Sequence, residues 1–242
     1  MKIIELKKEQ EVIKLVLAVL RKGGLVIYPT ETCYGIGGDA TNSKAVKKVL
    51  EFKGSRGGKP ISIAVSNKRM AEKYVIINET ADNLYKKFLP GPLTVVSKSR
   101  GKTIGALEAN KGTLGIRIPK YPLLIKIIKE FGKPITSTSA NTSGKKTPYC
   151  LKDVLKYTSK KRLELIDLFI DGGRLPFHLP STVVDTTLNE LATLRKGEIE
   201  ILETRSNSFV SDSEERTKEI AKRIIGKYSK LLSKSSFNLL IK

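Results

Sequence analysis

Residues 29–38 read Pro29-Thr30-Glu31-Thr32-Cys33-Tyr34-Gly35-Ile36-Gly37-Gly38, directly after the apolar run Leu25–Tyr28. The length of that run, and the proline that stops it, predict a buried β-strand. The glycines that follow allow a ligand or another backbone segment to approach closely. Because α/β sheets bind ligands at the ends of their strands, we interpret residues 29–38 as one wall of a binding site.

Two segments elsewhere in the chain complete this interpretation. Lys53-Gly54-Ser55-Arg56-Gly57-Gly58-Lys59-Pro60 places three cations among glycines, and Ser137-Thr138-Ser139-Ala140-Asn141-Thr142-Ser143-Gly144 supplies hydroxyl and amide groups. Cations and backbone amides bind phosphates, and hydroxyls and amides both donate and accept hydrogen bonds. Each segment alone is equally compatible with a solvated basic loop or with turns that open a helix. Together they predict a site for an anionic ligand such as a nucleotide.

The rest of the first 200 residues alternates between the periodicities of helices and strands. Short connections favour a mixed sheet over a wholly parallel one, so the expected fold is α/β, a twisted mixed β-sheet flanked by helices. The expected helices are residues 9–22, 43–52, 68–75, 81–88 and 122–130. The expected strands are residues 3–4, 25–28, 61–65, 93–96, 114–118, 135–137, 168–170, 182–185 and 192–195.

The composition changes near Thr204, which predicts a catalytic domain over residues 1–200 and a basic helical tail over residues 201–242. The tail carries net charge +4, and Ser211–Glu214 resembles a capping box. The helix expected after it is amphipathic and docked. Its apolar face is formed by Ile220, Ile224, Ile225, Tyr228, Leu231 and Leu232.

Composition narrows the class of protein. The 45 basic and 24 acidic residues give a net charge of +21, which attracts polyanions and leaves open a double-stranded RNA or tRNA binding module. Aromatic residues, at 6%, are too few to favour base stacking. No apolar run approaches the roughly 18 residues of a membrane span, and residues 1–10 do not form a signal peptide, so a cytoplasmic location is expected.

The counts of cysteine and histidine, and the spacing of the cations, limit the cofactors and the catalytic mechanisms that the chain could use. Two cysteines and one histidine, His178, give neither a disulfide framework nor a zinc site, and we expect no metal-binding side chains. His178 has no acid nearby in the sequence and is expected to be incidental. The spacing of Lys53, Arg56 and Lys59 does not match a P-loop.

Arg117 stands inside the apolar strand Gly115–Ile118, where a charge is costly unless a partner meets it. That partner is either a ligand carboxylate or phosphate, bound bidentately, or a structural acid. Ser181 opens one predicted strand and Arg195 ends another, so both lie where a ligand is expected.

Read in order, these blocks resemble the YrdC-like family, the threonylcarbamoyl-AMP synthases of tRNA modification. Several blocks in one order are far more specific than any single motif. The matching blocks are residues 29–37, Lys53 with Arg56, Pro90–Thr94, Gly115–Pro119, 137–144, Ser181–Asp185 and Leu194–Gly197.

The resemblance implies a reaction that joins L-threonine, bicarbonate and ATP into threonylcarbamoyl-AMP and releases pyrophosphate, with Mg²⁺ accompanying ATP. A partner complex would then transfer the group to adenosine 37 of tRNA. Lys53 and Arg56 would be catalytic. The residues expected at threonine are Thr32, Arg117, Ser139 and Ser181. The residues expected at ATP are Lys53, Arg56, Lys59, Thr113, Ser137, Asn141, Thr147 and Arg195.

This chain departs from the family pattern in three places. The family has Lys-x-Arg where this chain has Lys53-Gly54-Ser55-Arg56, so either Arg56 or Ser55 takes the place of the family arginine. Some relatives carry histidine where Ala64 stands here. The tail is short, so the chain resembles the short form of the family.

Overall fold

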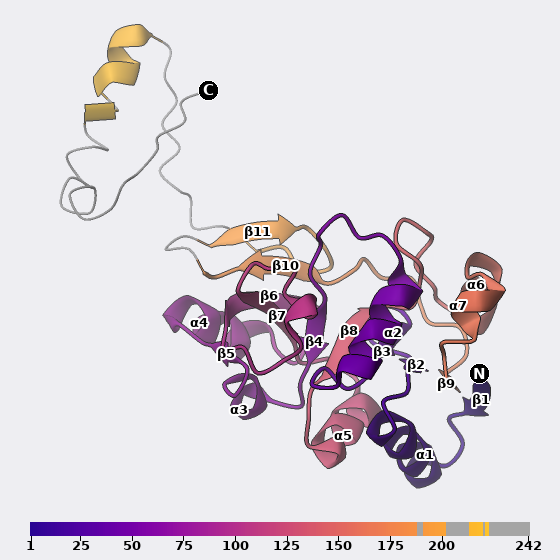
Figure 1. Cartoon of the computed structure of the whole chain (residues 1–242). Coiled ribbons are helices and arrows are strands. Elements are labelled where there is room, and N and C mark those ends of the chain that lie inside the picture. Colours follow the sequence, from indigo (N-terminus) through magenta and orange to yellow (C-terminus); the bar gives the residue numbers. More distant parts are fainter. Residues whose placement is uncertain (188–190, 202–212, 220, 223–242) are drawn as a thin grey trace. The chain divides into compact units, whose positions relative to one another are not determined.

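The structure, a computed structural model, describes residues 1–187, 191–201, 213–219 and 221–222 (Figure 1). The chain divides into two compact units, Met1–Glu203 and Thr204–Lys242. The first unit holds all three segments of the predicted site.

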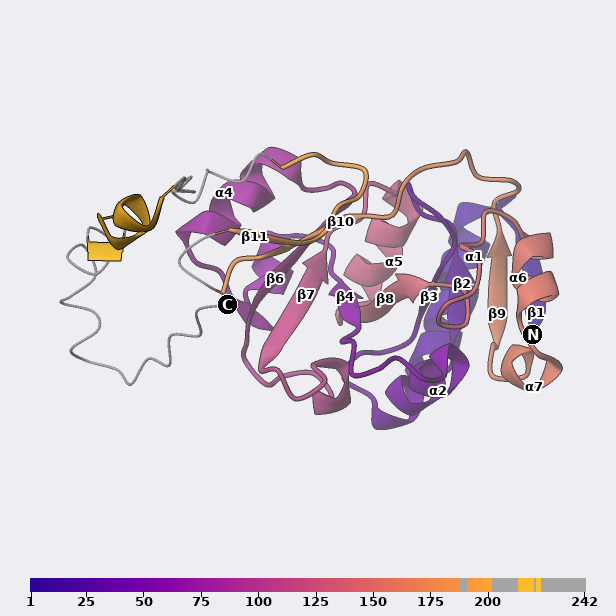
Figure 2. The same cartoon turned by 90° about the horizontal axis from the view of Figure 1, so that it is seen from above.

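The described part of the first unit contains a mixed sheet of eleven strands in the order β1-β9-β2-β3-β8-β4-β7-β6-β10-β11, with β5 added at β6 (Figure 2). The sheet contains parallel pairs, such as β4 with β7, and antiparallel pairs, such as β4 with β8. The predicted fold, a mixed sheet flanked by helices, is therefore confirmed. The strands are β1 (Lys2–Glu5), β2 (Val26–Tyr28), β3 (Gly35–Gly37), β4 (Ser62–Ala64), β5 (Val75–Ile76), β6 (Leu93–Ser99), β7 (Thr113–Arg117), β8 (Ile135–Ser139), β9 (Leu168–Asp171), β10 (Thr182–Asp185) and β11 (Ala192–Arg195).

Helices form where apolar residues recur at helical spacing, and in three of the described helices an asparagine side chain caps the first turn. Asn42, for example, accepts hydrogen bonds from the backbone amides of Lys44 and Ala45 at the start of α2. The helices are α1 (Glu9–Arg21), α2 (Ser43–Lys53), α3 (Lys68–Ala71), α4 (Glu79–Phe88), α5 (Pro122–Phe131), α6 (Leu151–Tyr157) and α7 (Lys160–Leu163), with a 3-10 turn at Gly105–Leu107.

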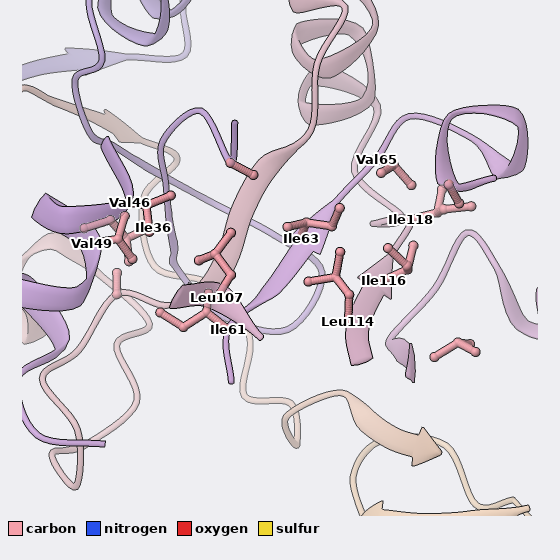
Figure 3. Close-up of a cluster of buried hydrophobic side chains, with 14 of the residues drawn as sticks. Ile36, Val46, Val49, Ile61, Ile63, Val65, Leu107, Leu114, Ile116 and Ile118 are labelled. Carbon is pink, nitrogen blue, oxygen red and sulfur yellow. The ribbon is translucent and has the colours of Figure 1, made fainter. Parts of the chain in front are cut away.

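Alternation along the strands divides the sheet into two faces with different neighbours. On one face, Ile36, Ile63 and Ile116 belong to a buried apolar cluster with Val46 and Val49 of α2 (Figure 3). On the other face, residues such as Tyr28, Ala64 and Ile135 pack against α1 and α5 in a second cluster. Figure 1 shows α1 and α5 adjacent to each other.

On the second face, the side chains change from apolar to small and polar along the strands. Ser62 and Ser137 lie two residues from Ala64 and Ile135 on the same strands, and they are paired across β4 and β8. Gly115 lies beside them, because a Cβ there would stand 2.4 Å from the Ser62 hydroxyl. This small, polar region, which we call the polar floor (Ser62, Gly115, Ser137 and Ser139), continues the face beyond the apolar cluster.

Some predicted elements differ from the observed ones. The helix expected over residues 68–75 ends at Ala71, and Val75 belongs to β5, where its side chain is buried against β6. The alternative that residues 137–144 open a helix is wrong, because Ser137–Ser139 are the end of β8. The short strand β3 was not expected, since glycine is a weak strand former.

In the second unit, residues 214–219 and 221–222 are helical. Ser213 caps this helix, because its hydroxyl accepts from the backbone amide of Arg216. The predicted capping residue, Ser211, lies outside the described residues. The apolar residues on which the amphipathic, docked helix was predicted lie outside the described residues: Ile220, Ile224, Ile225, Tyr228, Leu231 and Leu232.

Candidate functional site

Lys53 joins the cationic segment to the hydroxyl segment. Its ammonium group donates to the backbone oxygens of Ser139 (2.8 Å) and Asn141 (2.6 Å) and to Oδ1 of Asn141 (3.2 Å). The backbone amide of Ser143 in turn donates to the Lys53 oxygen (3.0 Å). The expectation that these distant segments meet is therefore confirmed.

Lys53 ends α2 and is only 3% exposed, which is unusual for a lysine. Burial, and after it the nearby charge of Arg56, lower the pKa of its ammonium group to about 7. Backbone and amide oxygens surround this cation, and none of the ion pairs found in the described chain involves it. A buried cation without a counter-ion is suited to receive a phosphate.

Residues 29–38 pack against the same hydroxyl segment. The backbone amide of Ala140 donates to the Tyr34 oxygen (2.8 Å), and the Tyr34 amide donates to the Pro148 oxygen (3.0 Å). Glycine is required in β3 because the Tyr28 ring lies against it. A Cβ at Gly35 would stand 2.8 Å from that ring.

The loop after α2 is held by Arg56 itself. Its guanidinium donates to the backbone oxygens of Lys59 (3.0 Å) and Pro60 (2.8 Å), and burial lowers its pKa. Arg56 is therefore bound to its own loop and is not turned to solvent. Ser55 and Lys59 are exposed.

A second group of charged side chains lies around Arg117 at the end of β7. Its Nη2 donates to Oε1 of Glu31 over 2.7 Å, and both side chains are largely buried. Arg117 is paired in register with Ala64, so the small side chain stands where some relatives carry histidine. Of the two partners considered for Arg117, the structure supplies the acid. Glu31 was not among the predicted site residues. The signal was that it is the only acid in residues 29–38.

Arg195 and Ser181 extend this second group. The Arg195 guanidinium donates twice to the Ser181 backbone oxygen, through Nε (2.9 Å) and Nη2 (2.6 Å). Burial lowers the pKa of Arg195, and the charge of Arg117 lowers it further, so the two arginines lie close together. Gly197 is essential to this arrangement, because a Cβ there would stand 2.0 Å from the Pro180 oxygen.

Cys33 lies between β2 and β3 and is buried. Burial raises the pKa of its thiol, while Arg117 and Lys53 lower it and Glu31 raises it. Charges from both groups therefore act on the Cys33 thiol. Thr32, beside it, is 2% exposed, and its hydroxyl lies 3.2 Å from that of Thr30.

The remaining predicted residues are more dispersed. Thr113 starts β7, four residues before Arg117, which places it roughly 13 Å away along the strand. Ser137 lies on the polar floor, and Ser139 Oγ donates to Asn141 Oδ1 over 2.6 Å. Thr147 is half-buried and precedes Pro148, which anchors Tyr34.

His178 does have an acid nearby, contrary to expectation. Its Nδ1 lies 3.1 Å from Oε1 of Glu198, whose other oxygen accepts from the Leu179 amide (2.8 Å). Both side chains are partly exposed. The pair ties residues 178–179 to the segment after β11.

The geometry thus provides a cationic end, at Lys53 and Arg56, and an end with mixed charge, at Arg117, Glu31 and Arg195. The first is suited to phosphate and the second to a small zwitterion or carboxylate. Chemistry at such a pair of charged ends would depend on positioning and on electrostatic stabilisation.

Comparisons with known proteins agree with this description. Residues 18–197 match the model of the Sua5, YciO and YrdC family, described as telomere recombination. The chain is 40% identical over 205 residues to a putative threonylcarbamoyl-AMP synthase of Methanocaldococcus jannaschii, covering 83% of this chain and 93% of the relative. It is 33% identical over 197 residues to the threonylcarbamoyl-AMP synthase of Bacillus subtilis, covering 81% of this chain and 56% of that protein.

Among solved structures, Sua5 of Pyrococcus abyssi in complex with L-threonine matches with a TM-score of 0.75 and 26% identity, over 96% of this chain and 78% of the other. Escherichia coli YciO matches with a TM-score of 0.72 and 25% identity, over 81% and 95%. This chain belongs to the Sua5, YciO and YrdC family. It spans about half the length of the Bacillus subtilis relative.

Two features are absent from the described residues. None of their helices has the length and apolar character needed to cross a membrane. None of their histidine, cysteine, aspartate and glutamate side chains form a group of three that could hold a metal ion.

Proposed function

We propose that this chain synthesises threonylcarbamoyl-AMP from L-threonine, bicarbonate and ATP, releasing pyrophosphate, for the modification of adenosine 37 in tRNA. The observation that carries the proposal is that residues 31–34 connect the two ends: Glu31 binds Arg117, and the Tyr34 oxygen accepts from Ala140 in the hydroxyl segment that Lys53 holds. One end suits the phosphates of ATP and the other suits an amino acid. The names of the curated relatives support the same activity.

In the proposed reaction the neutral amine of threonine takes up carbon dioxide, derived from bicarbonate, and loses a proton to form a carbamate. A carbamate oxygen then attacks the α-phosphorus of ATP, and the bond to pyrophosphate breaks. Negative charge grows on the phosphate oxygens, where Lys53 and Arg56 stabilise it. The ATP side would be lined by Ser137, Asn141, Thr113, Thr147, Lys59 and Arg195. The threonine side would be lined by Thr32, Ser139, Ser181 and Arg117.

We expect Mg²⁺ to enter with ATP, coordinated by phosphate oxygens and water. The proposed location is the cytoplasm, and the proposed partner is a complex that transfers the threonylcarbamoyl group. The net charge of +21 supports contact with tRNA.

Pyrophosphate release tests this function. With ATP and Mg²⁺ present, release should require both L-threonine and bicarbonate, and a mass equal to threonylcarbamoyl-AMP should accumulate. Equal hydrolysis of ATP without threonine would indicate a simple ATPase. Binding of tRNA with no turnover would favour the alternative of an RNA-binding protein.

We expect Arg56, rather than Ser55, to contact ATP. Arg56 lies near Lys53 and is half-buried, whereas Ser55 and Lys59 are exposed. Arg56→Ala should therefore weaken ATP binding at least tenfold, about 1.4 kcal/mol. Calorimetric titration of ATP measures this, with Ser55→Ala and Lys59→Ala as matched controls from the same loop. Wild-type affinity in Arg56→Ala, together with weak binding in Lys59→Ala, would move the contact to Lys59.

A further inference from the structure

The ion pair of Glu31 and Arg117 is incomplete. It has one hydrogen bond, from Nη2 to Oε1 over 2.7 Å, although the side chains are only 14% and 12% exposed. The other carboxylate oxygen, Oε2 of Glu31, is buried with no hydrogen-bond partner, and so is Nε of Arg117. One free acceptor and one free donor therefore lie buried on the two partners of a single pair.

A purely structural pair would be expected to satisfy these atoms, because guanidinium and carboxylate groups can join through two parallel hydrogen bonds. A buried polar atom without a partner is costly and calls for an explanation, such as a ligand. Nε of Arg117 needs an acceptor, and Oε2 of Glu31 needs a donor. An α-amino acid carries both, a carboxylate and an ammonium group, on one carbon atom.

The backbone around Glu31 is fixed by its neighbours. Thr30 Oγ1 accepts from the amides of Thr32 and Cys33, both at 3.2 Å, and donates to the Cys33 oxygen at 2.6 Å. The turn holds Glu31 at the end of β2, facing Arg117 on β7. Arg195 adds a second cation nearby. The group has two positive charges and one negative charge, which leaves an excess cation for a substrate carboxylate.

We propose that Glu31 binds the α-ammonium group of the amino acid substrate through Oε2, while Arg117 binds its α-carboxylate through Nε. The existing bond between Nη2 and Oε1 stays intact, so binding completes the pair without breaking it. This inference rests on the proposed function and deepens it. It makes a free α-amine a condition of recognition, before the amine loses its proton and reacts.

The test combines a change in the protein with a change in the substrate. Binding is measured calorimetrically without ATP, using L-threonine and 3-hydroxybutanoate, which corresponds to threonine without its amino group. The wild type should prefer threonine by at least about 100-fold, because a buried carboxylate is left unpaired with the analogue. Glu31→Gln should lose threonine affinity at least about tenfold and leave the analogue unchanged or more tightly bound.

Other outcomes overturn the proposal. Equal loss for both compounds in Glu31→Gln would mean that Glu31 only positions Arg117, and no loss for either would mean that it does not touch the substrate. Where Glu31→Gln fails to fold, the wild-type comparison still decides, since equal affinity for the two compounds sinks the idea. Absence of any binding of threonine, serine or alanine would also overturn it.

The same experiment separates this inference from the proposed function. Failure of pyrophosphate release, with threonine still bound in a manner that depends on Glu31, would overturn the synthase proposal and leave the inference standing. Normal release with no dependence of threonine binding on Glu31 would do the opposite. Binding of ATP to Glu31→Gln should match the wild type, which checks that the cationic end is intact.

Discussion

Lys53→Met should lower the rate of pyrophosphate release at least about 100-fold, the cost of removing one group that stabilises charge in a transition state. Lys53 also holds Ser139 and Asn141 through three hydrogen bonds, so its loss would loosen the hydroxyl segment as well. Lys47→Met, an exposed change on the same helix, is the matched control. A rate within twofold of the wild type would remove Lys53 from the catalytic machinery.

The pH dependence of stability shows whether Lys53 is as strongly buried as the structure indicates. Its pKa is lowered to about 7 in the folded chain, from an ordinary value of 10.5. Between these values the unfolded chain holds a proton that the folded chain has released, so the free energy of unfolding rises with pH. The rise, up to about 1.4 kcal/mol per pH unit, should be absent in Lys53→Met. Urea unfolding at pH 7, 8 and 9 measures it, and parallel curves for the two proteins would contradict it.

Arg117→Ala should raise the threonine concentration needed for half-maximal rate at least about 100-fold, a few kcal/mol for a lost charge-assisted contact. It should also cost about 3–5 kcal/mol of stability, because it leaves the buried carboxylate of Glu31 uncompensated. Steady-state kinetics and urea unfolding measure the two effects, and the requirement for ATP should stay unchanged.

Arg117→Lys gives the control for charge alone. It keeps a cation near Glu31 and should recover much of the stability, but an ammonium group cannot replace the fork of the guanidinium. Threonine use should therefore stay impaired. An Arg117→Ala protein that is unstable but fully active per folded molecule would make the ion pair structural only.

Much of the fold could be predicted because its signals are local. Apolar runs stopped by proline or glycine marked strands such as β2, and helical spacing with an asparagine cap marked α2. The two strands that escaped prediction depend on distant neighbours. Gly35–Gly37 forms a strand because β2 and β8 pair with it on both sides, and Val75 joins a strand because β6 lies beside it. No window of sequence contains that information.

The candidate site could also be predicted only in part. The sequence contained its residue types, and the resemblance ordered them into threonine and ATP ends, an assignment that stays a prediction. The partner of Arg117 could not be predicted, since Glu31 is 86 residues away in the chain. Nor could the burial of Lys53, because a lysine at the end of a helix is ordinarily solvated. Both depend on how β7 and the hydroxyl segment pack against residues that precede them.

The polar floor shares β4 and β8 with the apolar cluster beneath α1 and α5, since Ser62 and Ser137 lie two residues from Ala64 and Ile135 on those strands. Changes in what the protein recognises can therefore arise without disturbing what keeps it folded. Substitutions at Ser62 or Ser137 should alter the proposed ligand surface, while Ala64 and Ile135 continue to anchor the helices. Gly115 is excluded, because a Cβ there would stand 2.4 Å from the Ser62 hydroxyl. Such separation within single strands gives a lineage room to acquire new substrates on an old scaffold, and it marks the positions where a directed library would best begin.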